Sequence, residues 1–242
     1  MAPQVRPQFS SYTLTRRYTG SPDHRRPKRI DVLHASNLER GSRARPPPQS
    51  CRSETKRRPR LIRQAPVIIY FCADLSRLSN VSAWEGQPGK ALDKMDMFIT
   101  ATIDAALASQ NVALAAQSMG LGICYVGGAR NNAAQLCELL KLPDRVIALF
   151  GMAIGVPDPE NLPAVKPRLA LQEVLHKETW DDQDQQENVE MYNWSLEKFY
   201  DWRQLVGRQS WATFVSKTLA SGDLDGRERI RQVLLDRGFG LE

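Results

Sequence analysis

Residues 118–132 read SMGLGICYVGGARNN and follow a long alanine-rich segment. The first two glycines of the stretch end that segment, because glycine most readily takes the left-handed conformation that closes a helix. Residues 123–126 are a short apolar run of strand length, and Gly127 and Gly128 stop it. The stretch therefore predicts a helix end, a short strand and a glycine turn in immediate succession.

The preceding segment, residues 91–119, has the pattern of one long helix. Its apolar side chains recur at three- and four-residue steps, at Ile99, Ile103, Ala106, Leu107 and Leu114. A helix this poor in charge is expected to be buried on most sides, either at the centre of one domain or shared across a dimer interface. Polar residues interrupt the run 97–120, so no membrane-spanning segment is expected.

The rest of the chain beyond residue 64 alternates strands and helices. Residues 66–73 are apolar on both faces, as expected of a strand covered on both sides, and a second apolar strand is expected at 145–156. Between these strands, 74–89 is expected to be a loop, and Asn131 or Asn132 to cap a helix through residue 140. A proline-rich connection is expected at 157–167 and an acidic loop at 180–190. Three helices follow, at 191–205, 211–219 and 227–237. This order predicts an α+β or α/β domain.

Residues 1–63 differ in composition from the rest of the chain. They hold 16 Lys and Arg against 4 Asp and Glu, a charge of +12, whereas 64–242 hold 17 against 23, a charge of −6. They carry 8 of the 15 prolines and no sustained apolar period, so they offer no amphipathic face to bury. We expect a basic, Pro/Arg-rich head, disordered or aberrant, before an ordered domain at 64–242. A nucleic-acid tail, a membrane-surface tail, a transit peptide and a solvated tail without function are the open interpretations of this head.

Few side chains suit direct catalysis. The three histidines and four cysteines have no metal-ligand spacing, and no Gly-x-Ser-x-Gly, Walker A or Gly-x-Gly-x-x-Gly sequence is present. We therefore expect no metal and no catalytic side chain. Cys72 and Cys124 lie in apolar runs, where buried free thiols are expected, and these suit a reducing compartment such as the cytoplasm.

Two motifs indicate a ligand held by backbone and charge. Gly127 and Gly128 free two N–H groups to approach a planar ligand closely, with a tight turn as the alternative. The segment 166–168 is Lys-Pro-Arg, and its proline keeps Lys166 extended. Side chains two apart in extended chain point to the same side, so Lys166 and Arg168 suit a phosphate. The alternative is a solvated pair of surface charges.

These motifs also carry a resemblance to a known family. SMGLGICYVGGARNN at 118–132, LLKLP at 139–143, LFG at 149–151 and KPRL at 166–169 follow one another in this order, and FCAD at 71–74 fits as well. The combination resembles the oxygen-insensitive NADPH nitroreductase and flavin reductase branch of the nitroreductase family, over residues 64–242. The resemblance implies an α+β homodimer with a central mixed sheet flanked by helices, a helical C-terminal extension, and FMN sites at the subunit interface.

The resemblance also assigns roles to residues. It implies that Tyr125, Val126, Gly127 and Gly128 line the flavin, and that Lys166, Pro167 and Arg168 hold the FMN phosphate. Arg203 and Arg208 occupy places similar to those where family members contact the 2′-phosphate of NADPH. The family's N-terminal phosphate-binding motif is not matched, its nearest counterpart being residues 16–19, which indicates either a shifted reading frame or a divergent head.

The implied function is an FMN-dependent NAD(P)H oxidoreductase. NADPH would reduce the flavin, and a nitroaromatic, a quinone or free flavin, each a small aromatic acceptor, would then take two electrons in a ping-pong mechanism. The alternative is a degenerate protein of the same fold that holds no flavin and binds nucleic acid through its basic head. For the enzyme, neither a membrane nor nucleic acid is expected as a partner.

Overall fold

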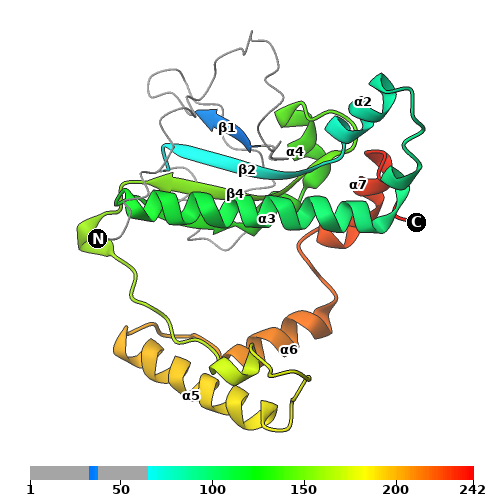
Figure 1. The fold of residues 1–242 in the computed structure, drawn as a ribbon. Coiled ribbons are helices and arrows are strands. Elements are labelled where there is room, and N and C mark those ends of the chain that lie inside the picture. The colour runs from blue at the N-terminus through cyan, green and yellow to red at the C-terminus, as the bar shows by residue number, and fades with distance from the viewer. Residues whose placement is uncertain (1–32, 38–64) are drawn as a thin grey trace, which may run out of the picture. The chain divides into compact units, whose positions relative to one another are not determined.

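The computed structural model describes the backbone of residues 33–37 and the chain from 65 to 242. It forms two compact units, each considered by itself below (Figure 1). The first holds the described residues up to Val156 together with Ile230–Glu242, and the second is Pro157–Arg229. Most of the basic head lies outside the described residues, so the expectation of disorder there stays a prediction.

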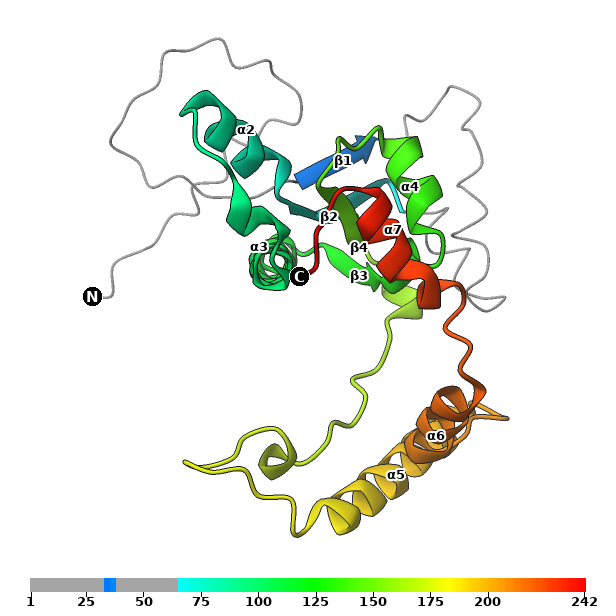
Figure 2. The same ribbon diagram turned by 90° about the vertical axis from the view of Figure 1, so that its right-hand side faces the viewer.

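A four-stranded sheet forms the centre of the first unit, in the order β1-β2-β4-β3 (Figure 2). The strands are β1 (Leu33–Asn37), β2 (Val67–Asp74), β3 (Gly122–Val126) and β4 (Val146–Gly155). The predicted strands at 66–73, 123–126 and 145–156 are thus confirmed, whereas β1 lies within the head. All three pairings between described strands are antiparallel, so the parallel neighbours of a mixed sheet are not among them.

Both faces of the sheet are covered. Phe71 and Ala73 of β2 pack into the cluster that includes the buried alanines of helix α3 (Met95–Ser118). Tyr70 and Cys72 point to the opposite face and pack in a cluster with Leu136 of α4 (Ala133–Leu140). Figure 2, in which α3 is seen end-on, shows the two helices on opposite sides of the sheet. An apolar strand with both faces covered is what the sequence predicts for β2.

Helix α3 is buried along one face only. The buried positions are small, at Ala101, Ala105, Ser109, Ala113 and Ala116. The opposite face exposes Ile99, Ile103, Leu107 and Leu114 by 47%, 51%, 62% and 55%. The expectation that this helix is buried on most sides within one chain is therefore wrong. By length and composition alone α3 could cross a membrane, a test that the core helix of a soluble protein also passes.

Helix α4 begins at one of the two predicted caps. Asn132 accepts a hydrogen bond from the Gln135 N–H at 3.4 Å through its side-chain oxygen, which satisfies one of the free donors of the first turn. Lys141 ends the helix in the left-handed conformation, with φ of 52°.

Two predicted loops are partly helical. The segment 74–89 contains α2 (Ser76–Trp84), and Asp74 accepts from the backbone N–H groups of Ser76 and Arg77 at 2.9 and 3.3 Å. A carboxylate that satisfies two first-turn donors favours a helix even where no apolar stripe marks one. The acidic segment 180–190 likewise includes the start of α5 (Gln185–Trp202).

The two cysteines expected in the core differ from each other. Cys72 is buried, and burial, with smaller effects of Cys137 and Asp74, raises the pKa of its thiol to about 12. Cys124 is exposed, so the expectation that it is a core residue is wrong. It lies on β3, which pairs only with β4 among the described strands.

The second unit is a helical hairpin with a short preceding coil. Its helices are α5 and α6 (Trp211–Ser221), and the side-chain oxygen of Asn193 accepts from the Ala212 N–H at 3.1 Å, which ties the start of α6 to α5. The buried Asn188 joins α5 to the preceding coil, because it donates to Glu173 at 2.8 Å and accepts from Gln172 at 3.2 Å.

The chain then returns to the first unit through α7 (Ile230–Asp236). Beyond it, the backbone of Glu242 donates to the Asp93 carbonyl and accepts from the Met95 N–H, each at 3.0 Å. The Lys94 ammonium lies 2.8 Å from the Glu242 carboxylate, and this hydrogen bond raises the pKa of Lys94. The last residues are thereby fixed to the start of α3.

We predict that Gly240→Ala destabilises the first unit. A Cβ at this position would lie 2.5 Å from the carbonyl oxygen and Cβ of Asp93, so the backbone must move. Overpacking of this kind lowers the free energy of unfolding by about 1–3 kcal/mol, measurable by urea denaturation followed by circular dichroism.

Gly127→Ala is the matched control. Its added Cβ would meet only the Arg130 Nη2 at 3.8 Å, an ordinary contact. The control should leave the midpoint of unfolding unchanged, and equal midpoints for both variants would contradict the close packing at Gly240.

Candidate functional site

The glycine turn follows β3 directly. Val126, the last residue of β3, pairs with Gly151 of β4, and residues 127–130 form one turn of 3₁₀ helix. The Gly128 carbonyl accepts from the Asn131 N–H at 3.1 Å. The Arg130 guanidinium donates to the Leu149 carbonyl at 2.6 Å, which ties the turn to β4. The turn is therefore held at its far end by a charged hydrogen bond to the central sheet.

Neither glycine is required by backbone conformation. Among the described residues, the glycines with positive φ do not include Gly127 or Gly128. Packing does not require glycine at 127 either, because an added Cβ would meet only Arg130, at 3.8 Å. The alternative of a turn that needs glycine for its own geometry is thus not supported at Gly127. The missing side chain leaves the backbone open to close approach by a flat molecule.

Tyr125 stands beside this turn as a partly exposed ring. It is 42% exposed, and its ring meets Phe150 edge-on with centroids 5.8 Å apart. Its hydroxyl oxygen lies 3.3 Å from the Ser109 Oγ on α3. An aromatic surface thus adjoins an open backbone segment, a combination that suits a planar aromatic ligand.

The predicted phosphate-binding cations lie in the second unit. Residues 162–170 have neither helix nor strand, and both Lys166 and Arg168 are exposed while Pro167 is half-buried. Within the described part of the chain, neither cation takes part in an ion pair. Both side chains are exposed, so among the described residues their charges are accessible to an anion.

Arg203 and Arg208 lie in the same unit, in the loop between α5 and α6. Arg203 ends α5, donating its N–H to the Phe199 carbonyl at 3.0 Å, and its guanidinium lies 5.6 Å from the centre of the Trp202 ring. Arg208 is exposed five residues later. The structure thus places residues 125–128 in one unit and all four cations in the other. That Lys166 and Arg168 bind the FMN phosphate, and Arg203 and Arg208 the 2′-phosphate of NADPH, stays a prediction.

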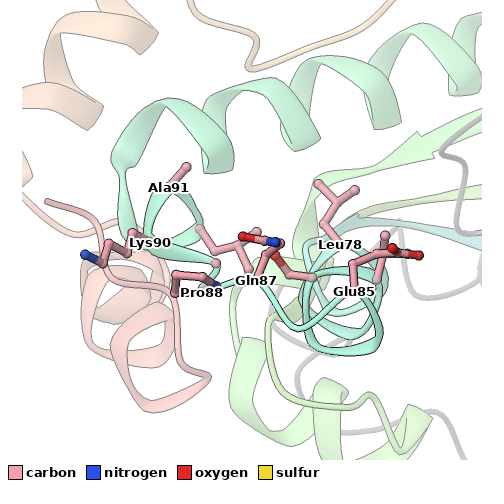
Figure 3. A pocket seen from close by; sticks show the side chains of 10 residues that line it. Leu78, Glu85, Gln87, Pro88, Lys90 and Ala91 are labelled. Carbon is pink, nitrogen blue, oxygen red and sulfur yellow. The ribbon is translucent and has the colours of Figure 1, made fainter.

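A hollow of about 440 Å³ lies elsewhere in the first unit, between α2 and the residues leading to α3 (Figure 3). Its walls include Leu78, Pro88 and Ala91, and in Figure 3 the charged ends of Glu85 and Lys90 point to opposite sides. Polar groups do not converge here as they do in most ligand sites. The sequence gives no sign of this hollow because it predicts a loop at 74–89.

Two family models match the chain. The one described as "Nitroreductase family" matches residues 16–156, and the one described as "Nitroreductase family, C-terminal domain" matches residues 166–242. The first match begins within the basic head, at the stretch 16–19 that is nearest to the family's N-terminal motif. The two matches follow the division into two units closely, because each contains most of one unit.

Similar proteins are known by sequence and by structure. An "FMN reductase (NADPH)" of Bacillus subtilis (strain 168) is 42% identical over 133 residues, 54% of this chain and 53% of the relative. An "NADPH-flavin oxidoreductase" of Vibrio harveyi is 33% identical over 179 residues, 74% of this chain and 70% of the relative. The solved structure of B. megaterium NfrA1 has a TM-score of 0.73 at 32% identity, covering 86% of this chain and 82% of that one.

These matches confirm the predicted fold class, an α+β sheet flanked by helices with a helical C-terminal extension. The matched part spans about half the length of the Bacillus relative.

Proposed function

Because the chain belongs to the nitroreductase family, we propose that it is an FMN-dependent NAD(P)H oxidoreductase. Its acceptors would be small aromatic molecules, namely nitroaromatics, quinones or free flavin, reduced by two electrons in a ping-pong cycle. We propose that it acts in the cytoplasm, a reducing compartment in which free thiols such as those of this chain persist.

The observation that carries this proposal is the open backbone at Gly127. Neither a positive φ nor a tight contact within the described chain calls for glycine there. A flat ring lying against the turn would require glycine at this position, because a Cβ would stand between the ring and the backbone N–H groups. Tyr125, partly exposed and two residues earlier, would flank such a ring.

The exposed cations Lys166 and Arg168 of the second unit suit the phosphate end of FMN. Its phosphate carries negative charge and several acceptor oxygens, which Lys166 and Arg168 would match with charge-assisted hydrogen bonds. Pro167 between them restricts the backbone, so less conformational entropy is lost when the two side chains bind.

The chemistry would belong to the cofactor and the binding to the chain. Bound FMN would supply the capacity to accept a hydride from NADPH and to pass two electrons to the acceptor. Residues 125–128 would orient the ring, Lys166 and Arg168 would hold the phosphate, and Arg203 with Arg208 would hold the 2′-phosphate of NADPH. In this proposal, no side chain of the protein acts as a general acid or base.

We also propose that the enzyme is a homodimer through α3. The exposed side chains Ile99, Ile103, Leu107 and Leu114 lie within one stripe of the helix, opposite the alanine face. An apolar stripe of this length on a soluble protein marks an interaction surface. A second copy is the occupant proposed, because a two-fold axis lets the stripe pack against itself.

The first test is reconstitution with flavin. The purified full chain incubated with FMN and freed of excess cofactor should keep the absorption bands of oxidised flavin and oxidise NADPH when a quinone is added. A colourless protein after reconstitution would contradict the proposal that the chain binds FMN.

The double variant Lys166→Ala with Arg168→Ala should weaken FMN binding by about a hundredfold or more, since each of the two charged hydrogen bonds contributes about 1.5–3 kcal/mol. Riboflavin, which lacks the phosphate, should bind the variant and the parent equally, as measured by quenching of flavin fluorescence. Lys177→Ala removes an exposed cation of the same unit and serves as the control. If the double variant lost as much affinity for riboflavin as for FMN, the two cations would not bind the phosphate.

The double variant Arg203→Ala with Arg208→Ala should raise the KM for NADPH by about tenfold and leave the KM for NADH unchanged, because only NADPH carries the 2′-phosphate. Lys217→Ala on α6 is the control. Parallel changes for both nucleotides would rule out this role for the two arginines.

Ile103→Asp should convert the dimer to a monomer, because it puts a charge at the middle of the apolar stripe. Light scattering on a size-exclusion column measures the mass directly. Leu139→Asp introduces the same charge at an exposed apolar position of α4, outside the stripe, and should leave the dimer intact. A parent protein that is monomeric at micromolar concentration would refute the proposed interface.

A further inference from the structure

The buried face of α3 contains one hydroxyl. Ser109 is 3% exposed, and the other buried residues of this helix are Ala101, Ala105, Ala113 and Ala116. Alanine at 109 would suit helix propensity and close packing better, because burial of a hydroxyl is unfavourable unless it forms hydrogen bonds. The hydrogen bonds of Ser109 therefore indicate what the hydroxyl does.

The direction of these hydrogen bonds follows from the number of hydrogens. The Ser109 Oγ donates to the Ala106 carbonyl of its own helix at 2.7 Å. A serine hydroxyl has a single hydrogen, so toward the Tyr125 hydroxyl, 3.3 Å away, Ser109 can only accept. Tyr125 is therefore the donor, and a chain of two hydrogen bonds runs from Tyr125 through Ser109 to the backbone of α3.

The ring of Tyr125 is thus fixed from two elements. Ser109 on α3 holds its hydroxyl end, and Phe150 on β4 contacts its ring. The next residue, Val126, packs into the cluster on the opposite face of the sheet, so Tyr125 lies on the α3 side. The ring remains 42% exposed, two residues before Gly127.

We propose that Ser109 is a positioning residue, which orients the Tyr125 ring as a fixed wall of the planar-ligand site. Because the phenol hydrogen is directed to Ser109, Tyr125 presents a ring and lone pairs to a ligand, and does not act as a proton donor to it. This inference rests on the proposed flavin function, and it assigns a role to a residue that touches no ligand itself.

The test is a double-mutant cycle on FMN affinity, with Ser109→Ala, Tyr125→Phe and the two combined. Each single variant should raise the Kd for FMN by about two- to tenfold, as expected for loss of one neutral hydrogen bond. The combined variant should raise it no further, because both changes break the same contact. The Kd is measured by quenching of flavin fluorescence, with the thermal midpoint of the flavin-free protein recorded alongside.

Ser118→Ala supplies the control. Ser118 makes the same kind of hydrogen bond within α3, donating to the Ala115 carbonyl at 2.8 Å, but its side chain is exposed. Its replacement should leave the Kd unchanged. Additive effects in the cycle, or a Ser109→Ala protein that binds FMN like the parent, would overturn the positioning role, whereas absence of FMN binding by the parent would overturn the proposed function itself.

Discussion

The close approach of α3 to the sheet is the constraint on which the first unit depends. Alanine and serine at its buried positions let the helix lie near β2, where larger side chains would hold it away. This places the Ser109 hydroxyl within reach of Tyr125 on β3. It also leaves the large apolar residues of the helix on the outside, at Ile99, Ile103, Leu107 and Leu114. The small size of the buried residues of α3 therefore permits the Ser109–Tyr125 contact, and the large residues of the helix form its exposed apolar stripe.

Most of the first unit could be predicted from local pattern. Strands β2 and β4 are long apolar runs, and α4 carries its own cap at Asn132, so each signal lies within its own element. Helix α2 was missed because its start depends on Asp74, a residue of the preceding strand, and because it buries no stripe. The exposure of Cys124 does not follow from the sequence, because an apolar neighbourhood does not show that its strand has a single neighbour among the described strands. Burial of α3 on one face only likewise depends on tertiary packing, which the sequence pattern of one helix does not show.

The signals on which the candidate site rests lie within short segments of the sequence. Glycines after a strand and cations two residues apart are local signals, and their order along the chain identified the family. What the sequence could not give is the reason for glycine at 127, which required the φ angle and the distance to Arg130. The hydrogen-bonding partner of Tyr125 was also beyond reach, since it lies 16 residues away on another element.

The second unit is inserted between β4 and α7, and both of its ends are joined to the first unit. The tail beyond α7 is fixed to the start of α3 by the backbone hydrogen bonds of Glu242. A segment tethered at both ends samples a smaller volume than one tethered at a single end. The cations at 166, 168, 203 and 208 thus lie on a segment that is covalently joined to the first unit at both ends and cannot separate from it when the protein is diluted.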